Sequence, residues 1–224
     1  MLQKSKILFS VSKNMDKYLK EVLGKNIPEK HTQIKNGFQN HMEVITDYCI
    51  ENYINKSELT EEFIKWLHKI LYPVWFRKAV TEKDWSLTIA MTPWEYKTLD
   101  NDIDSRINIW EKVNFTKVNE TEKEVNKLIQ EFNQKINTIK NKNELLKFIV
   151  KFSIDFAQIH PFWDGNSRVV SILMDTILIR YSLEPVYINF IKMKNIKEMY
   201  SAAEKYRETW DIEEILKVIE KYGE

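Results

Sequence analysis

The stretch from residue 143 to residue 159 limits the possible folds of this chain more than any other. On a helix it is apolar on nearly every side, with Leu145, Leu146, Phe148, Ile149, Val150, Phe152, Ile154, Phe156, Ala157 and Ile159. A helix without a polar face has to be enclosed by other elements. A second apolar-rich run with helical spacing, residues 169–180, follows after the loop 160–168. We therefore expect two central core helices, joined by a short and rigidly mounted loop.

The composition favours one mainly helical domain. The chain has 224 residues, enough for a substantial core, and only 4 glycines and 5 prolines, so loops should be few. Its net charge of +1 gives no bias toward nucleic acid or a membrane surface. The single cysteine, Cys49, excludes an internal disulfide, and its place on an apolar helical stripe indicates a core residue rather than a nucleophile. Without a signal-peptide pattern, we expect a cytoplasmic protein, with export as an effector left open.

The remaining elements are predicted from apolar spacing, capping residues and proline stops. Helices are expected at residues 28–53, 57–71, 118–139, 196–209 and 212–221, with only a short helix around residues 15–23. Two runs, residues 86–91 and 107–115, are typical of strands. Because isolated hairpins are marginally stable, this small β element must pack on the helical body or bind something extended.

The loop between the two central helices combines four chemically useful side chains. Gly165 and Asn166 favour a turn that leads into a helix N-terminus, whose N–H groups and dipole attract anions, phosphate above all. Arg168 can add a forked donor to the same anion, and Asp164 can hold a hard cation that accompanies polyphosphates. His160 titrates near neutral pH, as a general base should. The pattern indicates phosphoryl or nucleotidyl transfer.

Each of these side chains also has a purely structural interpretation. Asp164 can cap the helix, Arg168 can form a surface ion pair, and His160 can be a hydrogen-bonded core histidine. His68, beside the apolar Leu67, is interpreted as structural. A metal-dependent hydrolase built on His160 and Asp164 is the least favoured function, because the other histidines lack metal-ligand spacing.

The loop resembles the signature of the Fic family, HPFx(D/E)GN(G/K)RxxR. The matching positions are His160, Pro161, Phe162, Asp164, Gly165, Asn166 and Arg168. The resemblance implies an all-α, Fic-type helical domain with a small β-hairpin flap over the active-site loop. We expect residues 57–224 to form this Fic domain as a single compact unit. Residues 1–56 would be an N-terminal helical extension packed on its core.

The resemblance implies a protein adenylyltransferase, which moves AMP from ATP to a Ser, Thr or Tyr hydroxyl of a target protein. His160 would be the general base, Asp164 would hold Mg²⁺ between the α- and β-phosphates, and Phe162 would anchor the loop in the core. The residues expected to contact the nucleotide are Gly165, Asn166, Ser167, Arg168 and Tyr200. For Tyr200, simple helix packing is an equal alternative.

The family's target-holding flap precedes the helix expected at residues 118–139, so residues 107–117 are its first candidate here. Within it, Asn114, Phe115 and Thr116 are expected to contact the target, with Trp94 in a possible partner strand. Such a flap would pair with an extended target segment through backbone hydrogen bonds. For Phe115 and Trp94, packing of the β element is an equal alternative.

Two positions depart from the family signature. Ser167 stands where the family has Gly or Lys, and Ser171 stands where it has a second arginine, which contacts the γ-phosphate or an inhibitory glutamate. Loss of that arginine leaves open a Fic-fold transferase with another donor, either a different nucleotide or phosphocholine. A decayed Fic domain that acts as a binding partner is the non-enzymatic alternative. Glu51 lies in a partial match to the inhibitory motif. Because the arginine that would pair with this glutamate is replaced by Ser171, we expect no self-inhibition.

Overall fold

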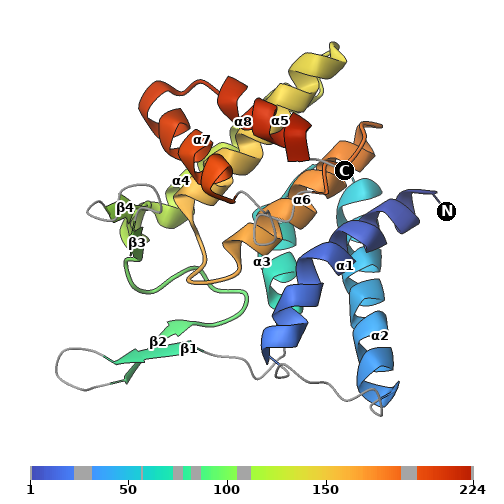
Figure 1. Ribbon diagram of the computed structural model, residues 1–224, viewed down its shortest axis with the longest axis vertical. Helices are drawn as coiled ribbons and strands as arrows, with labels where there is room; N and C mark the ends of the chain where they lie inside the picture. The colour runs from blue at the N-terminus through green and yellow to red at the C-terminus, as the bar shows by residue number, and fades with distance from the viewer. Residues whose placement is uncertain are drawn as a thin grey trace.

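The computed structural model describes residues 2–22, 32–56, 58–72, 78–81, 87–104, 112–187 and 196–222. Its helices are α1 (Leu2–Val22), α2 (Thr32–Cys49), the π-helical turn η1 (Ile50–Ile54), α3 (Glu61–Ile70), α4 (Val118–Ile136), α5 (Lys142–Ile159), α6 (Asn166–Arg180), α7 (Ile196–Thr209) and α8 (Glu213–Tyr222). Its strands are β1 (Lys78–Thr81), β2 (Leu87–Met91), β3 (Asp102–Asp104) and β4 (Lys112–Asn114). Figure 1 shows helices packed together with two small hairpins at one side, which confirms the predicted all-α class.

Helices α5 and α6 form the centre of the core, as the two apolar runs predicted. Every residue of α6 from Arg168 to Ile179 is buried, because α1, α3, α5 and η1 all contact this helix. Helix α5 is less enclosed than its apolar pattern suggested, since its first turn is exposed and Leu146 and Phe148 are only half-buried. Even so, none of the described helices combines the length and hydropathy that a membrane span requires.

Helix α1 is much longer than the short helix expected around residues 15–23. It begins at Leu2 and packs against both α2 and α6 (Figure 1). Ile7 and Val11, one turn apart, are fully buried, and the hydroxyl of Ser10 donates to Oδ2 of Asp175 in α6 at 2.6 Å. The prediction was wrong because lysines and other polar residues dilute the apolar pattern of this segment. A few side chains on one face are enough when a partner helix is there to bury them.

The β element consists of two separate two-stranded sheets. β1 pairs antiparallel with β2, which confirms the strand predicted at residues 86–91. β3 pairs antiparallel with β4, with Ile103 opposite Val113. β4 lies in the second predicted strand, of which residues 107–111 are outside the described residues. The partner of β4 is therefore β3, whereas Trp94, expected in a partner strand, lies in a turn with φ 88° that interrupts extended structure.

Cys49 is a core residue, as its place on the apolar stripe indicated. It lies at the end of α2 and is fully buried. Burial raises the pKa of its thiol to about 12, so the thiol stays protonated at neutral pH. A buried, protonated thiol is inert as a nucleophile.

Candidate active site

The loop between α5 and α6 begins and ends on residues with left-handed backbone. His160 (φ 52°, ψ 57°) ends α5, and its N–H donates to the carbonyl of Phe156 at 3.2 Å. Gly165 (φ 86°) immediately precedes α6. A Cβ at position 165 would collide with the hydroxyl and ring of Tyr72, so this position requires glycine for both its backbone and its space. The two residues turn the chain so that the N-terminus of α6 lies near His160.

The side chain of Asn166 closes the loop on itself. Its Oδ1 accepts from the N–H of Phe162 at 3.0 Å, and its Nδ2 donates to the carbonyl of Phe162 at 2.6 Å. The side chain is also buried. Both ends of the carboxamide therefore bond to the backbone of Phe162, which gives this residue a loop-shaping role, and its expected phosphate contact stays a prediction.

His68, on α3, connects the loop to the rest of the core. Its ring stacks on the buried Phe162, with a centroid distance of 3.8 Å and 1° between the planes. Its Nδ1 accepts from the N–H of Trp94 at 3.2 Å, which places the proton on Nε2, 3.0 Å from the carbonyl oxygen of Asp164. Burial lowers the pKa of His68 to about 4, so this neutral form persists at neutral pH. The contacts agree with the structural role inferred for His68.

The ring of His160 lies against the residue that follows β4. It stacks on Phe115 with a centroid distance of 3.9 Å and 22° between the planes. Burial lowers the pKa of His160 to about 4, and the positive charge of Lys97 acts in the same direction, while a hydrogen bond to the carbonyl of Ala157 opposes the shift. The imidazole is therefore neutral at neutral pH and able to accept a proton.

Lys97 is a site residue that the sequence analysis missed. It is 3% exposed, its N–H donates to the carbonyl of Pro161 at 2.9 Å, and its Nζ donates to Oδ1 of Asn101 at 2.9 Å. Burial lowers the pKa of its ammonium group to about 8. One lysine among 34 basic residues carries no local signal, and only the fold brings it next to the loop.

The side chain of Arg168 points into the protein. It is 6% exposed, its Nη2 donates to the hydroxyl of Tyr72, and its guanidinium carbon lies 4.8 Å from the centre of the Tyr72 ring. Its Nη2 is also 3.7 Å from Oδ1 of Asp164. A buried phenol and a carboxylate thus hold this guanidinium inside the loop, and its predicted phosphate contact stays a prediction.

Asp164 is the half-buried carboxylate of the loop. Its Oδ1 accepts from the N–H of Gly165 at 2.6 Å. No group of three metal-binding side chains occurs anywhere in the described ranges. A single carboxylate fits Mg²⁺, which takes most of its ligands from phosphates and water, better than a cation that needs a cage of protein ligands.

A cavity of about 220 Å³ brings together residues from distant segments. Of the expected site residues, His160, Ser167, Tyr200 and Phe115 line it. Its other walls are mostly apolar, with Val113, Ile154, Ala157, Val170, Met199 and Ala203, and the remaining polar lining residues are Gln158, Glu204 and Arg207. Ser167 lies on the first turn of α6, whose N–H groups have no partner within the helix. An apolar pocket with a few polar groups beside a helix N-terminus is suited to a small anionic ligand.

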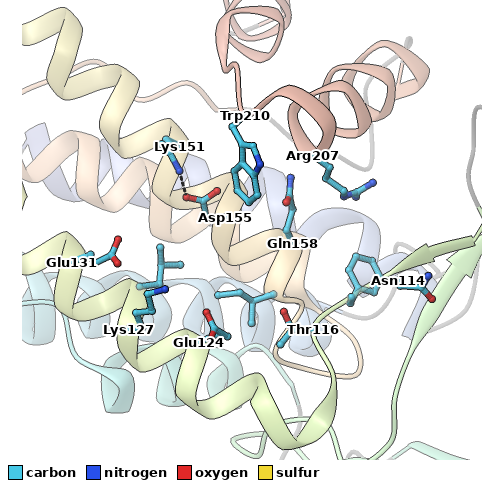
Figure 2. A pocket seen from close by; sticks show the side chains of 13 residues that line it. Asn114, Thr116, Glu124, Lys127, Glu131, Lys151, Asp155, Gln158, Arg207 and Trp210 are labelled. Carbon is cyan, nitrogen blue, oxygen red and sulfur yellow. Dashed lines mark hydrogen bonds and ion pairs between the residues drawn. The ribbon is translucent and has the colours of Figure 1, made fainter.

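A larger cleft of about 490 Å³ adjoins this cavity and is shown in Figure 2. Phe115, Gln158 and Arg207 line both. Asn114 and Thr116 line the cleft alone, so of the expected flap residues only Phe115 borders both hollows. Trp94 does not belong to either lining and instead packs edge-on against a tryptophan of α3 at 4.5 Å.

Fold and site together define a helical domain with an anion-attracting loop and a hairpin beside it. The model of the Fic/DOC family matches residues 58–178, more than half of the chain. This chain belongs to the Fic/DOC family, as the signature in the loop indicated. Family membership supports a Fic-fold transferase as the class of protein.

Solved structures share this fold at low sequence identity. A Fic-domain-containing signalling protein from Bacteroides thetaiotaomicron matches with a TM-score of 0.62 and 17% identity, covering 89% of this chain and 72% of that one. The N-terminal Fic domain of Bep8, a VirB-translocated effector from Bartonella sp. 1-1C, matches with a TM-score of 0.51 and 15% identity, covering 83% of this chain and 86% of that one. BepC, a VirB-translocated effector from Bartonella tribocorum with bound AMPPNP, matches with a TM-score of 0.51 and 14% identity, covering 84% of this chain and 86% of that one. A search of curated proteins found no match.

Glu51, the echo of an inhibitory glutamate, lies far from the loop. The carbonyl of its neighbour Tyr53 in η1 accepts from Arg180 at 2.7 Å, and Arg180 is the last residue of α6. The loop precedes Asn166, the first residue of that helix, which puts the two ends about 20 Å apart at 1.5 Å per residue. Glu51 is also exposed.

We therefore expect Glu51→Gly to leave the transfer rate within about twofold of the unmodified protein, because the carboxylate is a helix length away from the loop. The rate at which label passes from a labelled donor to protein measures this directly. Glu51→Gln is the matched control, since it removes the charge without adding a glycine to η1. A strong rise in rate for either variant would contradict the absence of self-inhibition.

Proposed function

We propose that this protein is a protein adenylyltransferase, which transfers AMP from ATP to a Ser, Thr or Tyr hydroxyl of a target protein. The observation that carries the proposal is the neutral ring of His160, which lines one cavity together with the first turn of α6. The AMPPNP bound to the related effector BepC supports a nucleotide as the ligand.

In the proposed reaction, His160 takes the proton of the target hydroxyl. The hydroxyl oxygen forms a bond to the α-phosphorus, and the bond from that phosphorus to the bridging oxygen breaks, so that pyrophosphate leaves. The N–H groups in the first turn of α6, around Ser167, hold the phosphate oxygens, and Gly165 lets the chain turn into that position. Asp164 would hold Mg²⁺, which supplies charge neutralisation when bound. Tyr200 forms part of the wall against the nucleotide.

The target would pair with the hairpin beside the loop. β3 and β4 form a sheet of two strands, so each leaves one edge that an extended segment can join. Asn114 and Thr116 flank Phe115, whose ring stacks on His160, and a target bound along this edge would pass close to the base. The division of the chain into an extension, residues 1–56, and a Fic domain, residues 57–224, belongs to the same proposal.

Another donor is the second candidate, and one residue favours it. Ser171 is buried, and its hydroxyl donates to the carbonyl of Ser167 at 2.8 Å. Where the family signature carries a charged donor, this chain therefore has a short side chain that is already bonded to its own helix. A different nucleotide or phosphocholine is the group that such a change would allow.

The test is transfer of label from a panel of donors in the presence of Mg²⁺, with the protein itself and lysate proteins as acceptors. Label from ATP that depends on His160 supports adenylyl transfer, and label from only another donor supports the second candidate. If nucleotide binds but no donor leaves a label, the domain is a binding partner and the proposed enzyme is wrong. Mass spectrometry of the labelled target then identifies the modified residue.

The pH dependence should show a base with a depressed pKa. Burial and the charge of Lys97 lower the pKa of His160 to about 4. As the pH is lowered, we therefore expect kcat/KM to stay constant through pH 6.5 and to fall only near pH 4 to 5, where His160 becomes protonated. An acid limb centred at the ordinary histidine pKa of about 6.5 would contradict this assignment.

Stability has to be followed alongside the rate. The folded pKa values of His68 and His160 lie below that of an unfolded histidine, so the unfolded chain binds more protons as the pH falls from about 6.5 toward 4, and stability decreases through that window. Unfolding in urea at each pH separates this loss from the titration of the base.

A further inference from the structure

The cavity that holds His160 has a single fixed cation among its described lining residues, Arg207 of α7. The two positions at which the family signature has arginines, 168 and 171, do not provide one to the cavity. Arg168 is held inward by Tyr72 and Asp164, and position 171 is a buried serine. A donor with a polyphosphate group would therefore meet no charged side chain of the loop in this cavity.

Arg207 is half-buried and keeps its donors available. Within the described part of the chain, its guanidinium has neither a hydrogen-bond acceptor nor an ion-pair partner at bonding distance. Burial lowers its pKa, and the carboxylate of Glu204, one turn earlier on α7, acts against that shift. An arginine stays protonated under these conditions, so the cavity contains an unbonded positive charge.

Gln158 adds a second unbonded donor at the same place. Its Nε2 is buried without a hydrogen-bond partner, and it lines both the cavity and the cleft together with Arg207. Figure 2 shows the two side chains projecting from α5 and α7. Buried donors normally have a hydrogen-bond acceptor, and leaving a buried donor without one costs about 1–3 kcal/mol. Donors gathered on two helices, one of them charged, indicate a ligand that brings anionic oxygens.

We propose that Arg207, with Gln158 beside it, binds the phosphate oxygens of the donor and replaces the cation that position 171 lacks. The inference rests on the proposed transfer function but not on which nucleobase the donor carries, since ATP, other nucleotides and nucleotide-activated phosphocholine share a diphosphate. A guanidinium matches two phosphate oxygens with parallel N–H donors, and the charge neutralises the leaving pyrophosphate.

The experiment measures equilibrium binding of Mg²⁺–ATP, AMP and adenosine to the full chain by calorimetry, for the unmodified protein, Arg207→Ala and Arg207→Lys. We expect Arg207→Ala to weaken ATP binding about tenfold or more, the usual effect of losing a charge-assisted hydrogen bond, and to leave adenosine binding within twofold. Arg207→Lys should retain part of the affinity, because it keeps the charge but loses the fork. Lys127→Met is the matched control. This exposed lysine lines only the cleft, so its loss should change the affinity for neither ATP nor adenosine.

Other outcomes overturn the proposal. An equal loss of ATP and adenosine affinity would place Arg207 on the nucleoside. ATP binding that survives Arg207→Ala unchanged would refute the phosphate contact while leaving the transferase intact. If the unmodified protein binds no nucleotide and transfers no label, the proposed function fails and the inference fails with it.

Discussion

Replacing His160 by asparagine should reduce transfer about 10²–10⁴-fold, the usual contribution of a general base. Asparagine is the better substitution here because it tolerates the left-handed backbone of this position (φ 52°) and cannot take up the proton. The loop hydrogen bonds of Asn166 and His68 do not involve the imidazole of His160, so the fold should persist. Single-turnover label transfer at saturating ATP measures the effect on the chemical step.

The control for this variant is nucleotide binding. The first turn of α6 is unchanged by the substitution, so the affinity for Mg²⁺–ATP should stay within a few-fold of the original. A His160→Asn protein that still transfers at more than about one tenth of the original rate would remove His160 from the proposed role.

Replacing Asp175 by alanine should destabilise the fold by about 2–5 kcal/mol, since buried and half-buried donors on two segments lose their acceptor. Its Oδ2 accepts from the hydroxyl of Ser10 in α1 at 2.6 Å. Its Oδ1 accepts from the N–H groups of Val186 and Tyr187 at 2.9 and 3.2 Å. One buried carboxylate thus connects the N-terminal helix, the centre of α6 and the segment that follows it. Urea unfolding, followed by circular dichroism, measures the loss.

Two milder variants test this interpretation. Asp175→Asn keeps an acceptor for the backbone N–H groups, and Ser10→Ala removes only the hydroxyl, so each should cost about 1 kcal/mol. The expected order of destabilisation is therefore Asp175→Ala first, with the other two well behind. Equal effects of all three variants would show that the network does not depend on the carboxylate.

Strong local patterns made much of the helical architecture predictable. The apolar runs at residues 143–159 and 169–180 required burial. Helix α3 begins after Thr60, a residue type typical of a helix cap, whose hydroxyl accepts from the N–H of Phe63 at 3.1 Å. The same reasoning failed for α1, where a sparse face of Ile7 and Val11 is helical because α6 is there to receive it. It also failed for Trp94, whose left-handed backbone is incompatible with the strand that was expected.

The sequence by itself determined the chemistry of the loop, because imidazole, carboxylate, glycine and helix N-terminus follow one another along nine residues. Only the tertiary structure decided which side chains face the ligand cavity. Arg168 turns inward toward Tyr72, 96 residues earlier in the chain, while Arg207 from α7 lines the cavity instead. Local sequence encodes which groups a segment carries, but their direction depends on acceptors and cavities that distant elements supply.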